Sequence, residues 1–219
     1  SGKICVSAGP RMAGAAGVGI KVIGRGGHGS RPDMSVNPVF CAASILTNTA
    51  TAWVNQITAG RTVTLGVTSI QGGEAPNVIP DTADILGSLR FFNDEEGEKA
   101  VRIFKNVAEH TAAMNNCQVQ FDDRFCVLCA PVINDEYYSN LISAALPEVL
   151  LENVTVSSCE PWYASESFSC YRRICPSVLA HLGINNPSYG SGAAHHNGFF
   201  DVDEGVLSTG VIATLKFVA

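Results

Sequence analysis

The chain has 219 residues, which is enough for one large domain or two small ones with buried cores. Hydrophobic residues make up 46% and charged residues 16%, with a net charge of -6, so the composition excludes a disordered chain and makes nucleic-acid phosphates poor partners. No run approaches the ~18 apolar residues that a membrane-spanning helix requires. We therefore expect neither nucleic acid nor membrane among its partners.

The first part of the chain alternates strand and helix patterns in the order β-α-β-β-α-β. The predicted strands are residues 17–24, 61–70, 83–92 and 118–125, and the predicted helices are residues 37–60 and 94–115. Alternating apolar residues that end in glycines are typical of strands. Apolar residues at helical spacing predict the two helices. Pro38 stands in the first turn of the first helix, and acidic residues stand in the first turn of the second. This order predicts a ferredoxin-like lid at 18–125: a four-stranded antiparallel sheet with two helices on one face.

The rest of the chain has the pattern of an incomplete α/β domain. Helices are predicted at 134–151, 165–174 and 203–218, and strands at 154–158 and 176–183. Strands that alternate with helices are typical of an α/β sheet. So few strands would leave one sheet edge and much apolar surface uncovered. We therefore interpret 126–219 as the C-terminal part of a larger domain, with 1–17 as the end of an earlier segment of that domain and a hinge.

Eight cysteines permit either disulfides or free thiols. The chain is long enough to fold without crosslinks, it shows no basic and apolar leader, and most cysteines stand in apolar or strand-like runs. We therefore expect reduced thiols in a cytoplasmic protein. Cys126 and Cys129 form a weak candidate for a zinc or redox module, because a structural zinc needs further ligands. Two small buried hydrophobic residues are the favoured interpretation.

Four polar side chains stand in loops or at a strand end, where they can reach a ligand. Glycines flank His28 and leave its imidazole uncrowded. Asn77 can donate to an oxyanion or merely shape a turn, and Arg90 can bind a carboxylate or merely face solvent. His196 follows a glycine-rich segment and can be a metal ligand or a solvated histidine. Taken singly, none of these residues decides a function.

The order of the motifs along the chain resembles one family. The motifs are Pro10-x-Met12-Ala13, Gly24-Arg25-Gly26-Gly27-His28-Gly29-Ser30-x-Pro32, Asn37-Pro38, Gly72-Gly73-x-x-x-Asn77-Val78-Ile79-Pro80, Gly87-Ser88-Leu89-Arg90, Ser165-Glu166-x-Phe168 and His196-Asn197-x-x-Phe200-Asp201-x-Asp203-Glu204. They are similar to metal-dependent amidohydrolases that include hippurate hydrolase, indole-acetyl-amino-acid hydrolase, aminoacylases and related carboxypeptidases. The resemblance implies an α/β metallohydrolase domain that binds two metals, usually zinc, and an inserted lid through which two copies form a homodimer.

The resemblance also implies a role for each candidate residue. His28 would reach the partner subunit's active site and stabilise the oxyanion, and Asn77 would assist it at the same substrate. Arg90 would hold the carboxylate of an N-acyl amino acid or peptide, and His196 would be the last metal ligand. The family's other ligands stand before the lid, and this chain begins just short of the lid. We therefore expect this chain alone to be inactive, although its parent protein is an enzyme.

Two classes of function stay open. The first is part of a metal-dependent amidohydrolase or peptidase that cleaves the amide bond of N-acyl amino acids. The second is a non-catalytic dimerisation or binding module that lacks the metal-binding half. The four candidate residues together favour the enzyme, because a pure dimerisation module does not need them. Gly198 and Ser167 depart from the family, which usually has Pro and Asp at these positions.

Overall fold

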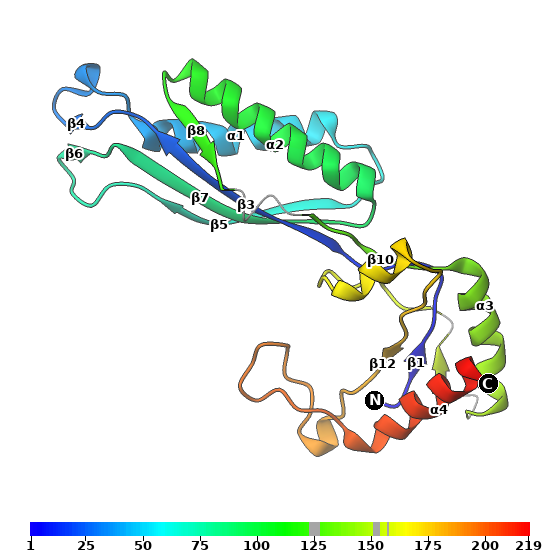
Figure 1. Ribbon diagram of the computed structural model, residues 1–219. Coiled ribbons are helices and arrows are strands. Elements are labelled where there is room, and N and C mark those ends of the chain that lie inside the picture. The colour runs from blue at the N-terminus through cyan, green and yellow to red at the C-terminus, as the bar shows by residue number, and fades with distance from the viewer. Residues whose placement is uncertain (123–127, 151–153, 157) are drawn as a thin grey trace. The chain divides into compact units, whose positions relative to one another are not determined.

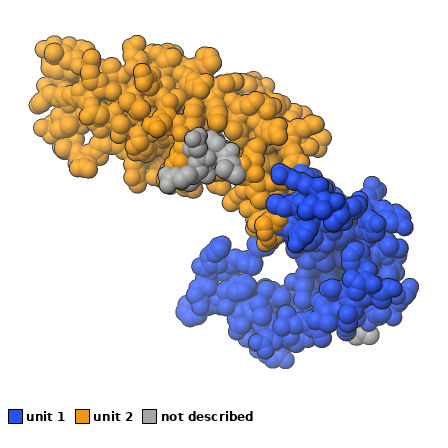
Figure 2. Space-filling view, in the orientation of Figure 1, with its two compact units in different colours: residues 1–12, 132–162, 168–219 blue, residues 13–131, 163–167 orange. Residues whose placement is uncertain are grey.

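The computed structural model describes residues 1–122, 128–150, 154–156 and 158–219 (Figure 1). The chain forms two compact units, which Figure 2 shows in different colours. Unit 1 consists of residues 1–12, 132–162 and 168–219, and unit 2 consists of residues 13–131 and 163–167. Among the described residues, no helix has both the length and the apolar composition that crossing a bilayer requires.

Unit 2 is built on an antiparallel sheet. In spatial order its strands are β5 (Val63–Gln71), β7 (Thr82–Phe91), β3 (Gly14–Ile23) and β8 (Gln118–Phe121), and β9 (Leu128–Cys129) also pairs with β3. β3 and β7 pair along their full length, from Gly14 opposite Phe91 to Ile23 opposite Thr82. The predicted antiparallel sheet is therefore present. The last strand ends at Phe121, and the predicted strand residues 123–125 lie outside the described residues.

Two helices cover one face of this sheet, as Figure 1 shows. α1 (Pro38–Gln56) begins after Asn37, whose side chain accepts the Val39 N–H. It ends before the predicted Gly60 because Ile57 has extended backbone angles. α2 (Asp94–Met114) begins after Asn93, and three acidic residues stand in its first turn, where they suit the helix dipole.

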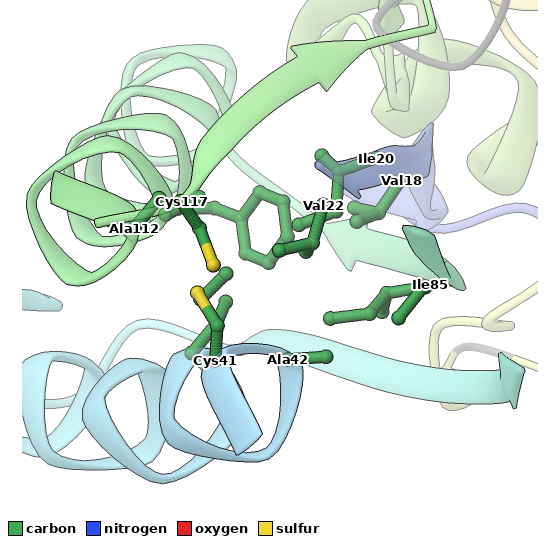
Figure 3. Packing of buried hydrophobic residues seen from close by; sticks show 12 residues of the cluster. Val18, Ile20, Val22, Cys41, Ala42, Ile85, Ala112 and Cys117 are labelled. Carbon is green, nitrogen blue, oxygen red and sulfur yellow. The ribbon is translucent and has the colours of Figure 1, made fainter. Parts of the chain in front are cut away.

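Side chains from both helices and from the sheet form the core of unit 2. The members of one cluster are Val18, Ile20, Val22, Cys41, Ala42, Ile45, Ala83, Ile85, Phe104, Ala108, Ala112 and Cys117. Within it the sulfur atoms of Cys41 and Cys117 point toward each other (Figure 3). Burial, and then the neighbouring Cys117, raise the pKa of the Cys41 thiol to about 12. A second cluster is formed by Ala16, Leu89, Phe91 and Ala100.

Unit 1 combines short strands with two helices. β1 (Ile4–Cys5) lies between β11 (Thr155–Val156), which is parallel to it, and β12 (His181–Leu182), which is antiparallel. The other elements are β2 (Gly9–Met12) paired with β10 (Val132–Asn134), the helices α3 (Glu136–Ala145) and α4 (Leu207–Val218), and 3-10 turns at Leu146–Glu148, Ser167–Arg173, Pro187–Tyr189 and Glu204–Val206. The predicted helix at 165–174 is therefore a 3-10 turn. Of the predicted strand at 176–183, only His181 and Leu182 form a strand in the structure. Pro176 at the start of the predicted strand has no N–H to donate to a neighbouring strand.

Cys5 and Cys159 form a disulfide, so the prediction that all eight cysteines are reduced thiols is wrong. The parallel pairing of β1 with β11 brings the two residues together although they are 154 positions apart. Connectivity of this kind cannot be deduced from cysteine spacing. Free thiols among the described residues include Cys41, Cys117, Cys170 and Cys175. Cys126, one half of the candidate Cys126–Cys129 pair, lies outside the described residues.

Candidate functional site

A two-stranded ribbon in unit 2 brings His28 and Asn77 together. β4 (Gly27–His28) pairs antiparallel with β6 (Val78–Ile79), which directly follows Asn77. The Gly29 N–H donates to the Asn77 carbonyl oxygen at 2.8 Å. A Cβ on Gly29 would lie 3.3 Å from that oxygen, tighter than an ordinary contact, so the close approach of the two segments favours glycine. The side chains of His28 and Asn77 are both exposed on this ribbon.

Ser30 orients the His28 ring. The Ser30 N–H donates to His28 Nδ1 at 3.1 Å, and Ser30 Oγ lies 2.8 Å from the same nitrogen. Because Nδ1 accepts the backbone N–H, the neutral imidazole carries its proton on Nε2. The ring therefore presents an N–H donor on the side away from the loop, which is the group that oxyanion stabilisation requires.

Asp81 ties the loop before His28 to the turn after β6. Its Oδ1 accepts the Gly26 N–H at 2.8 Å, and its carbonyl oxygen accepts the Gly24 N–H at 2.8 Å. Sequence reasoning missed Asp81 and Ser30 as positioning residues. A signal for Ser30 existed, because serine often bonds to groups two residues away.

Arg90 lies at the opposite end of the sheet from His28. It is paired with Ala15 of β3 and Thr64 of β5, whereas His28 follows the other end of β3, beyond Ile23. The eight residue-to-residue steps from Ala15 to Ile23 span about 27 Å at about 3.4 Å per step. The structure therefore brings His28 and Asn77 together and leaves Arg90 apart from them. Arg90 is half-buried, and its guanidinium has no ion-pair partner in the described part of the chain.

His196 lies in a loop of unit 1. Its φ of 64° is in the left-handed region, which is uncommon for a residue other than glycine. The ring of the neighbouring His195 lies 4.7 Å from the Trp162 ring and 4.9 Å from the Phe200 ring, centroid to centroid. These aromatic contacts hold His195, while His196 is exposed and makes no ring contact or side-chain hydrogen bond with the described residues. Of the two histidines, His196 therefore has the imidazole that is available to a ligand.

The described residues do not assemble a metal site. No three His, Cys, Asp or Glu side chains among them lie close enough together to hold a metal ion. A zinc ion needs three or four ligands. His196 can therefore supply one ligand at most, and the described residues support no metal-dependent step by themselves.

Comparison with known proteins shows which proteins this chain is similar to and how much of each it covers. Residues 12–115 match the family model of a peptidase dimerisation domain. The chain is 29% identical over 217 residues to thermostable carboxypeptidase 2 of Saccharolobus solfataricus, covering 97% of this chain and 53% of that protein. It is 28% identical over 207 residues to N-acetylcysteine deacetylase of Bacillus subtilis, covering 94% of this chain and 52% of that protein. The chain thus spans about half the length of these curated relatives.

The fold is similar to that of a solved relative. The Bacillus subtilis YxeP protein, a dinuclear metal binding peptidase from the M20 family, superposes with a TM-score of 0.76 at 24% identity, over 99% of this chain and 52% of that chain. The mixed α/β fold class is thereby confirmed, and so is the predicted resemblance to metal-dependent amidohydrolases and carboxypeptidases. Residues 12–115 thus match a peptidase dimerisation domain, in a chain that is similar along nearly its whole length to a carboxypeptidase and an N-acyl amino acid deacetylase.

Proposed function

We propose that this chain is part of a dimeric, metal-dependent amidohydrolase that hydrolyses the amide bond of N-acyl amino acids or similar peptides. The observation that carries the proposal is that His28 and Asn77 lie together in the region that matches a dimerisation domain. The hydrogen bond from the Ser30 N–H to His28 Nδ1 favours the tautomer in which His28 Nε2 carries the proton. The relative named N-acetylcysteine deacetylase supports this substrate class, because N-acetylcysteine is an N-acyl amino acid.

The proposed chemistry assigns one task to each side chain. The His28 Nε2–H and the Asn77 amide donate to the oxyanion that forms when water attacks the amide carbonyl, and each donor contributes of order 3 kcal/mol. Arg90 binds the substrate carboxylate through its forked guanidinium. We propose two zinc ions as the metal, with His196 as one of their ligands.

The separation of Arg90 from His28 supports a homodimer as the working unit. One copy of unit 2 holds them at opposite ends of its sheet, so a single small substrate cannot touch both within one subunit. A site that combines His28 and Asn77 of one subunit with the partner subunit's Arg90 removes this conflict. The active site is then complete only in the dimer.

The edge strand β5 is the proposed site of self-association. It has nine residues without a charged side chain, and Val67 and Ile70 on it are exposed. In the described part of the chain its outer edge is unpaired, and β7 is its only neighbour. A long, uncharged edge strand is a template for pairing with another chain.

Light scattering during gel filtration tests the dimer. We expect the 219-residue chain to have twice its monomer mass of 23.1 kDa. Val67→Lys and Ile70→Lys together should shift it toward the monomer, because like charges would meet at the pairing edge. Met114→Lys, at an exposed position on α2, is the control and should leave the dimer intact. A monomeric wild-type chain would contradict the proposal.

Hydrolysis by the complete reading frame tests the activity. That protein, including any coding sequence upstream of Ser1, is assayed on N-acetyl amino acids together with its zinc content. His28→Ala should lower kcat by about 10²–10³, and Arg90→Ala should raise KM for carboxylate substrates more than for the matching amides. A well-folded dimer that binds no metal and hydrolyses none of these substrates would favour the alternative, a non-catalytic dimerisation module.

We also propose a cytoplasmic location. The free thiols of Cys41, Cys117, Cys170 and Cys175 support it, because oxidising compartments favour paired cysteines. Fractionation of cells that carry the tagged complete protein tests this, and recovery outside the cytoplasm would refute it.

A further inference from the structure

An arginine and a histidine surround one sulfur of the Cys5–Cys159 disulfide. Arg11 Nη1 donates to the Cys159 carbonyl oxygen at 2.7 Å and lies 3.7 Å from Cys159 Sγ. His181 is opposite Cys5 in the β1–β12 pair, and its Nδ1 lies 3.8 Å from Cys159 Sγ. Both side chains therefore contact the same sulfur, from two different elements of unit 1.

Arg11 is buried without an ion-pair partner among the described residues. The residue is 7% exposed, and its Nε has no hydrogen-bond partner among the described residues, nor has His181 Nε2. Glu160 is the carboxylate that influences Arg11, but it is exposed and forms no ion pair with Arg11 in the described part of the chain. Burial lowers the pKa of Arg11, and burial together with Arg11 lowers the pKa of His181. With the neutral disulfide intact, the buried guanidinium thus has the exposed Glu160 near it but no ion-pair partner among the described residues.

We propose that Cys5–Cys159 is a redox-active disulfide that a dithiol reduces, and that Arg11 and His181 stabilise the Cys159 thiolate of the reduced form. A thiolate at Cys159 places a negative charge 3.7 Å from Arg11 Nη1, and a proton on His181 Nδ1 can be donated to it. The reduced form thereby gains an interaction that the oxidised form does not have. A disulfide with a stabilised reduced form is easier to reduce.

The exchange proceeds in two balanced steps. One thiolate of the dithiol attacks Sγ of Cys159, the less buried of the two residues, and forms a mixed disulfide. The electron pair of the broken S–S bond goes to Cys5 Sγ, which takes a proton and lies 3.3 Å from Ser7 Oγ. The second thiolate of the reductant then attacks its own mixed disulfide and releases Cys159 as a thiolate beside Arg11. Two electrons pass to the protein, and the dithiol becomes a disulfide.

A redox titration of the 219-residue chain tests the proposal. The protein is equilibrated with defined ratios of reduced and oxidised dithiothreitol and trapped with an alkylating mass tag, and Cys5 and Cys159 are quantified by peptide mass spectrometry. We expect Arg11→Gln to lower the equilibrium constant for reduction about tenfold or more, since a neighbouring cation stabilises a thiolate by at least that factor. Tenfold corresponds to a midpoint about 30 mV more negative.

Matched variants separate this effect from a general change in charge or fold. Arg31→Gln removes one charge from an exposed ion pair with Asp33 and should leave the midpoint unchanged. Arg11→Lys keeps the charge and should stay near the wild-type midpoint. If circular dichroism shows that Arg11→Gln is unfolded, His181→Gln carries the test and should shift the midpoint in the same direction. Equal midpoints for wild type and the folded test variant, or free thiols at Cys5 and Cys159 at every ratio, would overturn the proposal.

Discussion

Gly97 in α2 is a helical residue whose enlargement should destabilise the protein. In a helix interior, Gly→Ala usually stabilises by about 1 kcal/mol. At Gly97 the added Cβ would lie 2.5 Å from Cδ2 of Phe91, whose side chain is 1% exposed and has no room to move aside. Overpacking of a buried site costs typically about 1–3 kcal/mol. We therefore expect Gly97→Ala to lower the free energy of unfolding of unit 2 by about 1 kcal/mol net.

Urea unfolding followed by Trp53 fluorescence measures this change, because Trp53 packs against the Phe91 cluster. Trp162→Phe removes the other tryptophan of the chain from the signal. In a Phe91→Leu background the ring is gone, so the same Gly97→Ala change should be neutral or stabilising. Stabilisation of the wild-type background, or equal effects in both backgrounds, would refute the packing argument.

Three further predictions follow from local contacts. Burial lowers the pKa of His181 in the folded protein. As the pH falls through about 6.5, the unfolded chain therefore takes up a proton on His181 before the folded chain does, which favours unfolding. The stability to urea should fall from pH 7 to pH 5 in the wild type and change less in His181→Gln. Asn93→Ala removes the cap of α2 and should lower the free energy of unfolding by about 1 kcal/mol in the Trp53 assay, and an unchanged value would contradict the cap. Iodoacetamide at pH 8 should label exposed Cys170 much faster than buried Cys41, whose thiol pKa is raised to about 12, and equal rates would contradict its burial.

Unit 2 could be predicted from sequence because independent local signals agree there. At α2 the Asn93 cap, the acidic first turn and the helical spacing of apolar residues all indicate one helix, and the structure places it at Asp94–Met114. Ile85, Leu89 and Phe91 alternate in the sequence and are all buried in β7. In unit 1 the strands are two to four residues long, too short for periodicity to be read.

The candidate site was only partly accessible from sequence. The order of motifs indicated His28, Asn77, Arg90 and His196, but no local pattern encodes their mutual positions. Pairing of β4 with β6 depends on a register between segments about 50 residues apart, and each strand has only two residues. The β3–β7 register likewise decides that Arg90 lies far from His28.

The Cys5–Cys159 disulfide was missed for the same reason. Its partners meet through the parallel β1–β11 pair, which joins two segments far apart in the sequence, and the two cysteines are 154 positions apart. In the chain-entropy description, closing a loop of 154 residues stabilises by at most about 5 kcal/mol. Pairing over such a separation follows from the tertiary fold and not from cysteine spacing.

The central claim is that each active site draws on two subunits, and mixed dimers of the complete protein test it most directly. His28→Ala and Arg90→Ala homodimers should each be nearly inactive under conditions that do not saturate the enzyme. After the two variants are unfolded, mixed in equal amounts and refolded, half of the dimers contain one copy of each, and in every mixed dimer one site keeps both wild-type residues. We predict recovery of about a quarter of the wild-type activity, as expected for random pairing in a symmetric dimer. If His28 and Arg90 instead served the same site from one subunit, every site would lack one of them, and the absence of recovery would contradict the account.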